Sequence, residues 1–136
     1  ERSRPHDCSI RIRFFISAKH MIVAVQSDAP LILWLQGGPG GSSLFGLFVE
    51  HGPFYVTEQL EVRARSTAWS LPYNVLYIDQ PAGTGFSFTK SELGYVTDQE
   101  RVADDLYEAL KQFYTLFPDL LSQDLYITGE SYAGRS

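Results

Sequence analysis

The fold of this chain is decided by ten residues close to its end, Leu125-Tyr126-Ile127-Thr128-Gly129-Glu130-Ser131-Tyr132-Ala133-Gly134. A short run of aromatic and β-branched residues gives way to glycine, a flanked serine and then small residues. This order is typical of a strand–turn–helix elbow, in which small neighbours let the backbone turn sharply and expose the serine hydroxyl. Taken alone, the segment fits a surface turn equally well, so the rest of the chain has to decide between the two.

Size and composition restrict the class of protein. The chain has 136 residues, of which 44% are hydrophobic and 14% aromatic, and its formal net charge is -5. These values describe one globular domain, and the absence of a Lys/Arg block argues against nucleic acid as a partner. The longest apolar run, Leu31–Leu35, is far shorter than the about 18 residues of a membrane span. Cys8 is the single cysteine, so the chain cannot form an internal disulfide.

Three apolar runs predict the strands of a sheet: Leu31–Leu35, Asn74–Asp79 and Leu125–Thr128. Each is continuously apolar rather than alternating, which predicts strands buried on both faces of a mostly parallel sheet. A helix is expected over about residues 98–117, with Thr97 and Glu100 as a capping box, an apolar stripe facing inward, and Asp104 and Asp105 facing solvent. Strand, helix and strand in this order predict a parallel crossover. The fold class is therefore α/β.

The remaining segments carry weaker patterns. Residues 10–16 and 21–25 are two β-leaning runs that predict an antiparallel hairpin. A short helix is expected over Leu44–Val49, and Tyr55–Leu71 reads as irregular loop with exposed charges.

A glycine-rich loop, Gly37-Gly38-Pro39-Gly40-Gly41, follows the first buried strand. A nucleophilic serine needs a base and fixed N–H donors for the oxyanion of its tetrahedral intermediate, and only glycine lets backbone N–H groups approach that closely. In an α/β-hydrolase sheet this loop and the residue after the serine supply the donors, here Gly38 and Tyr132. The sequence argues against a phosphate-binding loop, because Gly41-Ser42-Ser43 lacks the lysine. It also argues against a dinucleotide fingerprint, because Gly83-Thr84-Gly85 is not followed by the third glycine.

Three segments together resemble the signature segments of the serine carboxypeptidases, and the sequence is most similar to the vitellogenic-like branch of that family. They are Trp34-Leu35-Gln36-Gly37-Gly38-Pro39-Gly40-Gly41-Ser42-Ser43, Asp79-Gln80-Pro81-Ala82-Gly83-Thr84-Gly85-Phe86-Ser87 and Gly129-Glu130-Ser131-Tyr132-Ala133-Gly134. The resemblance covers residues 29–136 and implies the N-terminal portion of an α/β-hydrolase catalytic domain. Residues 1–28 match the family only loosely.

The resemblance also implies roles for individual residues. Ser131 matches the acylating nucleophile, and Gly38 and Tyr132 match the oxyanion donors. The positions that recognise the free C-terminal carboxylate of a peptide are matched by Trp34, Gln36, Gly37, Glu50 and Glu130. Most relatives have asparagine where Gln36 stands. The family further implies a lysosomal or secreted location, although Glu1–Asp7 lacks the apolar core of a signal peptide.

The two glutamates at the carboxylate positions also allow a physical argument that does not depend on the resemblance. Glu50 and Glu130 facing a substrate carboxylate place like charges together, which raises a pKa until a proton is shared. A protonated glutamate can then donate a hydrogen bond to the substrate, so activity at acidic pH is expected. The alternative is that both glutamates are structural turn residues.

No histidine is placed to serve as the base of Ser131. In an α/β hydrolase the histidine follows the serine, whereas His6, His20 and His51 all precede it. His51 is expected to be a packed loop histidine. No His/Cys/Asp/Glu cluster has metal-ligand spacing, so neither a metal nor a cofactor is expected.

The sequence therefore predicts part of a serine-type carboxypeptidase acting on peptides with a free C-terminus, without the triad acid and histidine. We expect the isolated chain to be inactive. Two alternatives stay open: a truncated product without catalysis of its own, or an acyltransferase or lyase built on the same scaffold.

Overall fold

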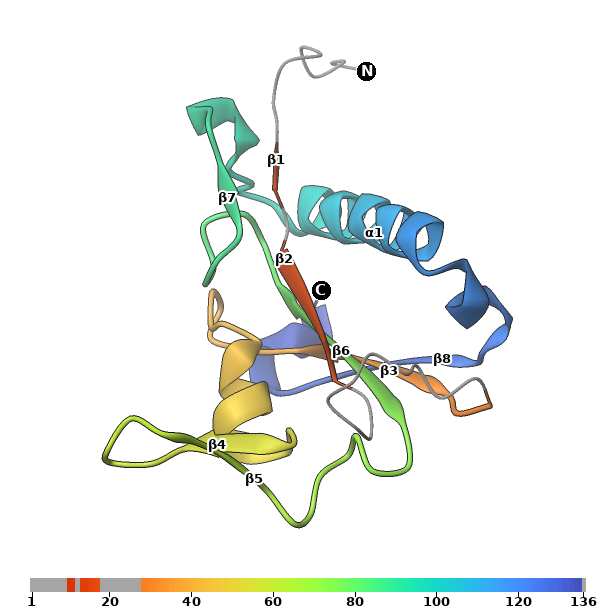
Figure 1. The fold of residues 1–136 in the computed structure, drawn as a ribbon. Helices are drawn as coiled ribbons and strands as arrows, with labels where there is room; N and C mark the ends of the chain where they lie inside the picture. The colour runs from red at the N-terminus through yellow and green to blue at the C-terminus, as the bar shows by residue number, and fades with distance from the viewer. Residues whose placement is uncertain (1–9, 12, 18–27, 136) are drawn as a thin grey trace.

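The computed structural model describes residues 10, 11, 13–17 and 28–135. Its centre is a four-stranded sheet in the order β2 (Arg13–Ser17), β6 (Asn74–Asp79), β3 (Leu31–Leu35) and β8 (Leu125–Gly129). Strand β3 runs parallel to both β6 and β8, and β2 runs antiparallel to β6. Figure 1 shows helix α1 (Gln99–Leu116) on one side of this sheet. The predicted mostly parallel α/β architecture is confirmed.

Strands β3 and β6 are buried at every residue, as their continuous apolar runs predict. Alternate side chains point to opposite faces of a strand, and the core therefore divides in two. Leu31, Leu33 and Leu35 pack with Leu106 and Phe113 of α1 on one face. On the other face, the intervening residues pack with Leu47 and its neighbours; the buried members there are Ile32, Trp34, Val75 and Tyr77. Each such side chain contributes about 1.5–3 kcal/mol relative to an exposed one.

The predicted helix is confirmed, but its cap and one of its faces were predicted wrongly. The Asp98 side chain, not Thr97, accepts the hydrogen bond from the N–H of Arg101, at 2.9 Å. Aspartate is at least as good an N-cap as threonine, and here it lies directly before the first helical residue. Asp105 is buried at 9% exposure rather than solvated, because it lies next to the buried Leu106 on the inward side of the helix.

Strand β8 is not the buried strand that its composition predicts. It lies at the edge of the sheet, and the side chains of Tyr126 and Ile127 are 55% and 62% exposed. Leu125 packs against the core, but the described residues leave Tyr126 and Ile127 largely uncovered. The prediction failed because an apolar run shows that a strand is suited to burial, and it does not show which neighbours will cover the strand.

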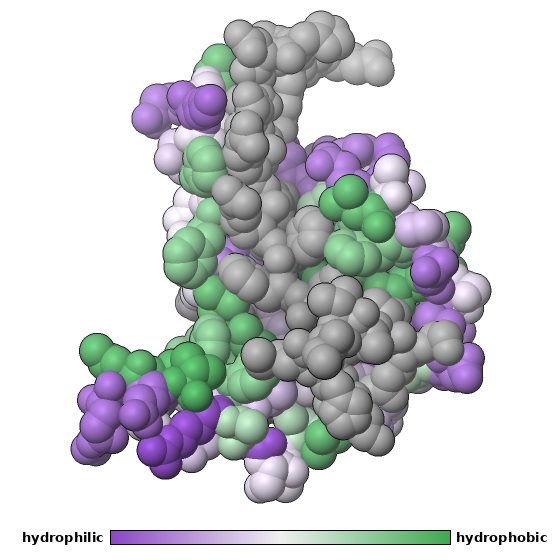
Figure 2. All heavy atoms as spheres, in the orientation of Figure 1, coloured by the Kyte–Doolittle hydropathy of each residue, from purple (hydrophilic) through white to green (hydrophobic). Residues whose placement is uncertain are grey.

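Residues 55–71 were also predicted wrongly as irregular. They include most of a hairpin of β4 (Phe54–Val56) and β5 (Val62–Ala64), two strands too short for an alternating pattern to stand out. At its turn Leu60 is 85% exposed with a positive φ of 62°. The hairpin extends from the body of the protein, and Figure 2 shows its apolar and charged residues side by side.

Several shorter elements complete the description. Strand β1 (Ile10–Arg11) pairs with β7 (Phe88–Thr89). Single helical turns span Gly46–Glu50, Glu92–Gly94, Pro118–Ser122 and Ser131–Arg135. The first overlaps the expected helix at Leu44–Val49. Of the predicted N-terminal hairpin, residues 13–17 pair with β6, while residues 21–25 lie outside the described residues. Within the described ranges, no helix has the length and apolar character needed to cross a membrane.

Candidate active site

Three loops meet at one end of the sheet, because the parallel strands β3, β6 and β8 all have their carboxyl ends there. The loops after β3, β6 and β8 carry the glycine run, the Gln80-Pro81 turn and Ser131 respectively. Ligand sites of open α/β sheets form at the carboxyl ends of the strands, where loops from different strands converge. The three signature segments of the sequence are therefore neighbours in space.

Ser131 occupies a strained, exposed position at the end of β8. Its φ is 57°, and Leu60 is the other non-glycine residue of the described chain with a positive φ. Holding a non-glycine residue there costs about 1–3 kcal/mol and is found mainly where the surrounding structure requires it. The turn is tight because a Cβ at Gly129 would lie 2.7 Å from both Ala133 Cβ and the Leu35 carbonyl oxygen. This is the geometry of a nucleophile elbow.

Gly37 packs directly against the turn that carries Ser131. A Cβ at Gly37 would lie 2.6 Å from the Glu130 carbonyl oxygen, 3.0 Å from Ser131 Cβ and 3.1 Å from the Tyr132 nitrogen. Only glycine fits between these atoms. The glycine loop and the serine turn are thus in van der Waals contact through their backbones.

The glycine loop itself adopts conformations that other residues avoid. Gly38 and Gly40 have φ values of 120° and 83°, and the Gly41 N–H donates to the Gly37 carbonyl oxygen at 2.9 Å. Gly38 directly follows Gly37, the residue in contact with the serine turn. The Gly37 carbonyl group and the Gly38 N–H belong to the same planar peptide group, so the hydrogen bond from Gly41 also fixes the direction of the Gly38 N–H. Gly38 and Tyr132, the two predicted oxyanion donors, lie on the two backbones that meet at Gly37.

A chain of hydrogen bonds links the predicted carboxylate-binding residues. The Trp34 indole N–H donates to Gln36 Oε1 at 3.0 Å, and Gln36 Nε2 donates to Glu130 Oε2 at 2.8 Å. The first bond fixes which way the Gln36 amide faces, so that its NH₂ group points towards Glu130. The longer side chain of glutamine reaches this carboxylate directly.

Glu50 joins the same cluster from the helical turn Gly46–Glu50. Desolvation raises the pKa of Glu50, the neighbouring Glu130 carboxyl raises it further, and the Gln36 amide acts in the opposite direction. Gly46, a residue that the sequence did not single out, makes the approach possible. A Cβ there would meet the Trp34 indole nitrogen and would lie 3.2 Å from Glu50 Oε2. Trp34, Gln36, Glu50 and Glu130 therefore form one group, which we call the carboxylate cluster.

His51 is packed among aromatic rings, as expected. It stacks on Trp69 with 4.1 Å between ring centroids and contacts the edge of Trp34 at 4.3 Å. Its Nδ1 lies 3.2 Å from the Tyr77 hydroxyl. Burial, followed by the charge of Arg65, lowers the pKa of His51. His51 therefore serves as a packing partner of Trp34. His6 and His20 lie outside the described residues.

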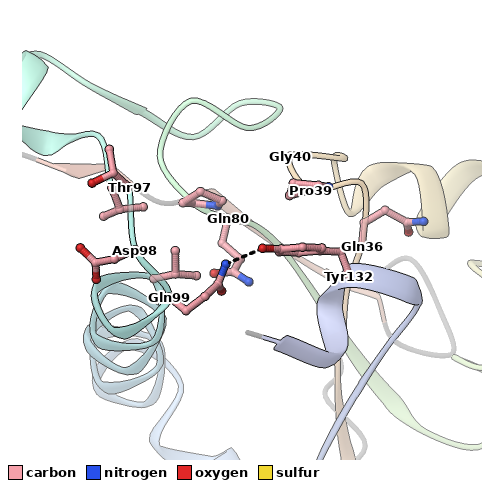
Figure 3. Close-up of a pocket in the computed structure, with 11 residues that line it drawn as sticks. Gln36, Pro39, Gly40, Gln80, Thr97, Asp98, Gln99 and Tyr132 are labelled. Carbon is pink, nitrogen blue, oxygen red and sulfur yellow. Dashed lines mark hydrogen bonds between the residues drawn. The ribbon is translucent and has the colours of Figure 1, made fainter.

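A pocket of about 170 Å³ lies between the glycine loop, the start of α1 and Tyr132. Figure 3 shows Gln99 and Tyr132 pointing towards each other across it, with the Gln99 Nε2 donating to the Tyr132 hydroxyl at 3.0 Å. Gln80, which also lines the pocket, is 8% exposed. The sequence did not predict Gln80 or Gln99 at the site, although the position of Gln80 directly after a parallel strand was a usable signal.

Among residues 10, 11, 13–17 and 28–135, no three His, Cys, Asp or Glu side chains are grouped so as to hold a metal ion. The arrangement offers an exposed serine, backbone N–H groups beside it, and the carboxylate cluster next to the glycine loop. Such a site can bind a carboxylate next to a carbonyl group under attack.

Comparisons with known proteins identify the family to which this chain is related. The model of the serine carboxypeptidase family matches residues 14–136. The mouse protein named probable serine carboxypeptidase CPVL is 60% identical over 108 residues, which are 79% of this chain and 23% of the mouse protein. The vitellogenic carboxypeptidase of Aedes aegypti is 49% identical over 110 residues, which are 81% of this chain and 23% of that protein.

A solved structure shows the same fold. The prohormone-processing carboxypeptidase of Saccharomyces cerevisiae matches with a TM-score of 0.82 and 32% sequence identity, over 96% of this chain and 30% of that chain. The chain thus spans 23% of the length of the curated relatives compared above.

Proposed function

Because this chain belongs to the serine carboxypeptidase family, we propose that the protein containing it removes C-terminal residues from peptides through an acyl-enzyme on Ser131. One observation carries the proposal. Gly37 lies in contact with the turn that carries Ser131, and it directly follows Gln36, a member of the carboxylate cluster. A peptide whose C-terminal carboxylate binds at the cluster would place the carbonyl group of its last peptide bond next to Ser131.

In the proposed reaction, Ser131 Oγ attacks the carbonyl carbon of the last peptide bond and its proton passes to a base. The N–H groups of Gly38 and Tyr132 donate to the resulting oxyanion. The proton then passes to the leaving nitrogen, the C–N bond breaks, and water hydrolyses the ester formed on Ser131. We propose that the base and its acidic partner are supplied by parts of the protein beyond this chain.

The carboxylate cluster supplies the preference for peptide ends. The Gly37 N–H and the Gln36 amide can donate to a substrate carboxylate, and a protonated Glu50 can donate a further hydrogen bond. Hydrogen bonds to charged groups contribute about 1.5–3 kcal/mol each. A substrate whose C-terminus is an amide lacks the charge that these donors recognise.

The test compares two matched peptides with the full-length protein. An N-blocked dipeptide with a free carboxylate should be cleaved, its C-terminal amide should be cleaved at least tenfold less efficiently, and Ser131→Ala should abolish both reactions. Labelling by a fluorophosphonate, which needs an activated serine, should also be lost in Ser131→Ala. Equal cleavage of acid and amide would refute the role of the carboxylate cluster, and no labelling of the wild-type protein would refute the nucleophile.

We also propose a lysosomal or secreted location. Two relatives carry names that support it, the lysosomal protective protein of mouse, 50% identical over 108 residues, and the venom serine carboxypeptidase of Apis mellifera, 53% identical over 107 residues. The raised pKa of Glu50 suits an acidic compartment. Fractionation of cells that express the tagged full-length protein tests this location, and a cytosolic signal would refute it.

A further inference from the structure

Asp79, the last residue of β6, bridges two of the loops that form the site. Its side chain is fully buried, at 0% exposure. Oδ1 accepts hydrogen bonds from the Ser42 hydroxyl at 2.7 Å and the Ser43 N–H at 2.9 Å. Oδ2 accepts from the Phe86 N–H at 2.9 Å. One carboxylate oxygen therefore holds the end of the glycine loop, and the other holds the loop after β6.

The surrounding atoms make this bridge rigid. The Ser43 hydroxyl donates to the Ile78 carbonyl oxygen at 2.6 Å and accepts from the Gln36 N–H at 3.2 Å. This second contact fixes the start of the glycine loop as well as its end. A Cβ at Gly85 would meet Asp79 Oδ2, so only glycine allows the loop after β6 to pack this closely on the carboxylate.

The glycine loop is thus held at both ends by β6 and its last residue. Between them lie Gly37, in contact with Ser131, and Gly38, whose N–H direction is fixed by the turn. The glycines have no side chains with which to hold their own position. Their placement depends on the polar contacts at the two ends of the loop.

We propose that Asp79 is a positioning residue, which places the N–H of Gly38 for oxyanion binding by anchoring the glycine loop through Ser42 and Ser43. The inference rests on the proposed function, because it assigns Asp79 to the same reaction. Asp79 is not a catalytic residue, since its buried carboxylate is directed at loop backbone and Ser42. If Asp79 contributed to stability alone, its replacement would lower the melting temperature but would not weaken binding of the transition state by the folded protein.

The central variant is Asp79→Asn in the full-length protein. The amide has one carbonyl oxygen, so it can accept from one loop only and turns an NH₂ group against the donors of the other. Displacement of a catalytic group by about 1 Å can cost about 100-fold in rate. We expect kcat to fall about 10- to 100-fold with KM changed less than about threefold, because the side chains of Trp34, Gln36 and Glu130 hydrogen-bond to one another and not to Asp79.

Ser87→Ala is the matched control. The Ser87 hydroxyl donates to the Asp79 backbone carbonyl at 2.6 Å, so this variant removes a buried hydrogen bond beside Asp79 but leaves the three bonds of the carboxylate intact. It should lower the melting temperature with kcat close to that of the wild type. Ser42→Ala removes one of the three bonds and should give an intermediate fall in kcat.

Two further measurements separate positioning from general damage. A peptidyl boronic acid, which forms a tetrahedral adduct on a serine, should bind Asp79→Asn more weakly by the same factor as kcat falls. Inhibition by the released amino acid, which uses the carboxylate cluster, should be unchanged. Unchanged kcat in folded Asp79→Asn, or an equal fall of kcat in Ser87→Ala, would overturn the proposal.

Hydrogen–deuterium exchange makes the result independent of activity. In Asp79→Asn, the amides of residues 37–43 should exchange at least tenfold faster than in the wild type, while those of α1 should not change. Unaltered protection of the loop would refute the anchoring role even if the wild-type protein proved inactive. An inactive wild type that showed the expected exchange would refute the proposed function alone.

Discussion

Replacement of Gly37 by alanine tests the contact on which the candidate active site depends. The added Cβ would lie 2.6 Å from the Glu130 carbonyl oxygen, whereas ordinary contacts begin at 3.4 Å, so the glycine loop and the serine turn must separate by about 0.8 Å. The Glu130 oxygen and the nearby Tyr132 nitrogen are backbone atoms and cannot rotate aside. We therefore expect kcat to fall by about 100-fold and the free energy of unfolding by about 1–3 kcal/mol.

The assay is steady-state cleavage of an N-blocked dipeptide by the full-length protein, with thermal unfolding followed in parallel. Gly134→Ala is the control, because a Cβ at Gly134 would meet no atom of the described residues within 4 Å, and its kcat should match that of the wild type. Wild-type kcat in a folded Gly37→Ala protein would show that the loop and the serine turn do not act together, and the reasoning would fail.

Three further predictions follow from the cluster and the core. Gln36→Leu removes both hydrogen bonds of the amide, so KM for a peptide with a free C-terminus should rise about tenfold while KM for the peptide amide stays unchanged; equal effects on both would contradict it. Because burial and Glu130 raise the pKa of Glu50, its carboxyl stays protonated to a higher pH than a free glutamate. It ionises as pH rises through that pKa, so kcat/KM should decline from acidic towards neutral pH, and Glu50→Gln should flatten this limb of the profile; an unaltered profile in the variant would refute the assignment. Phe113→Ala leaves a cavity at a fully buried position between α1 and the sheet, so the free energy of unfolding should fall by about 3–5 kcal/mol in a denaturant titration. The exposed control Gln112→Ala should lower it by less than about 0.5 kcal/mol.

Much of this architecture could be predicted from sequence because local patterns determined it. The uninterrupted apolar runs of β3 and β6 predict strands covered on both faces, and the stripe from Val102 to Phe113 predicts the face that α1 buries. The glycine run after Trp34 predicts a loop in close contact with another backbone, and Gly37 has such a contact with the turn at Ser131.

The wrong or missing predictions have a different cause. They depend on contacts between residues that are distant in sequence, which a local pattern does not contain. The apolar composition of β8 says nothing of whether a neighbour covers Tyr126 and Ile127. The burial of Asp105 depends on how α1 is rotated against the sheet. Likewise, Gly46 and Gln80 acquire their places at the site only from the packing of the loops after β3 and β6.

The register of the sheet has a consequence for the order in which the site can form. Strand β3 is central, and Leu31 pairs with Asn74 of β6 and with Leu125 of β8. The second partner lies about twice as far along the chain as the first, which adds only about 0.6 kcal/mol of loop-closure entropy. Pairings between strands so distant in sequence nevertheless slow the folding of a chain. Gly37 therefore acquires its contact with the serine turn only when β8 docks, and the glycine loop, already anchored on β6, can serve as the template on which that turn closes.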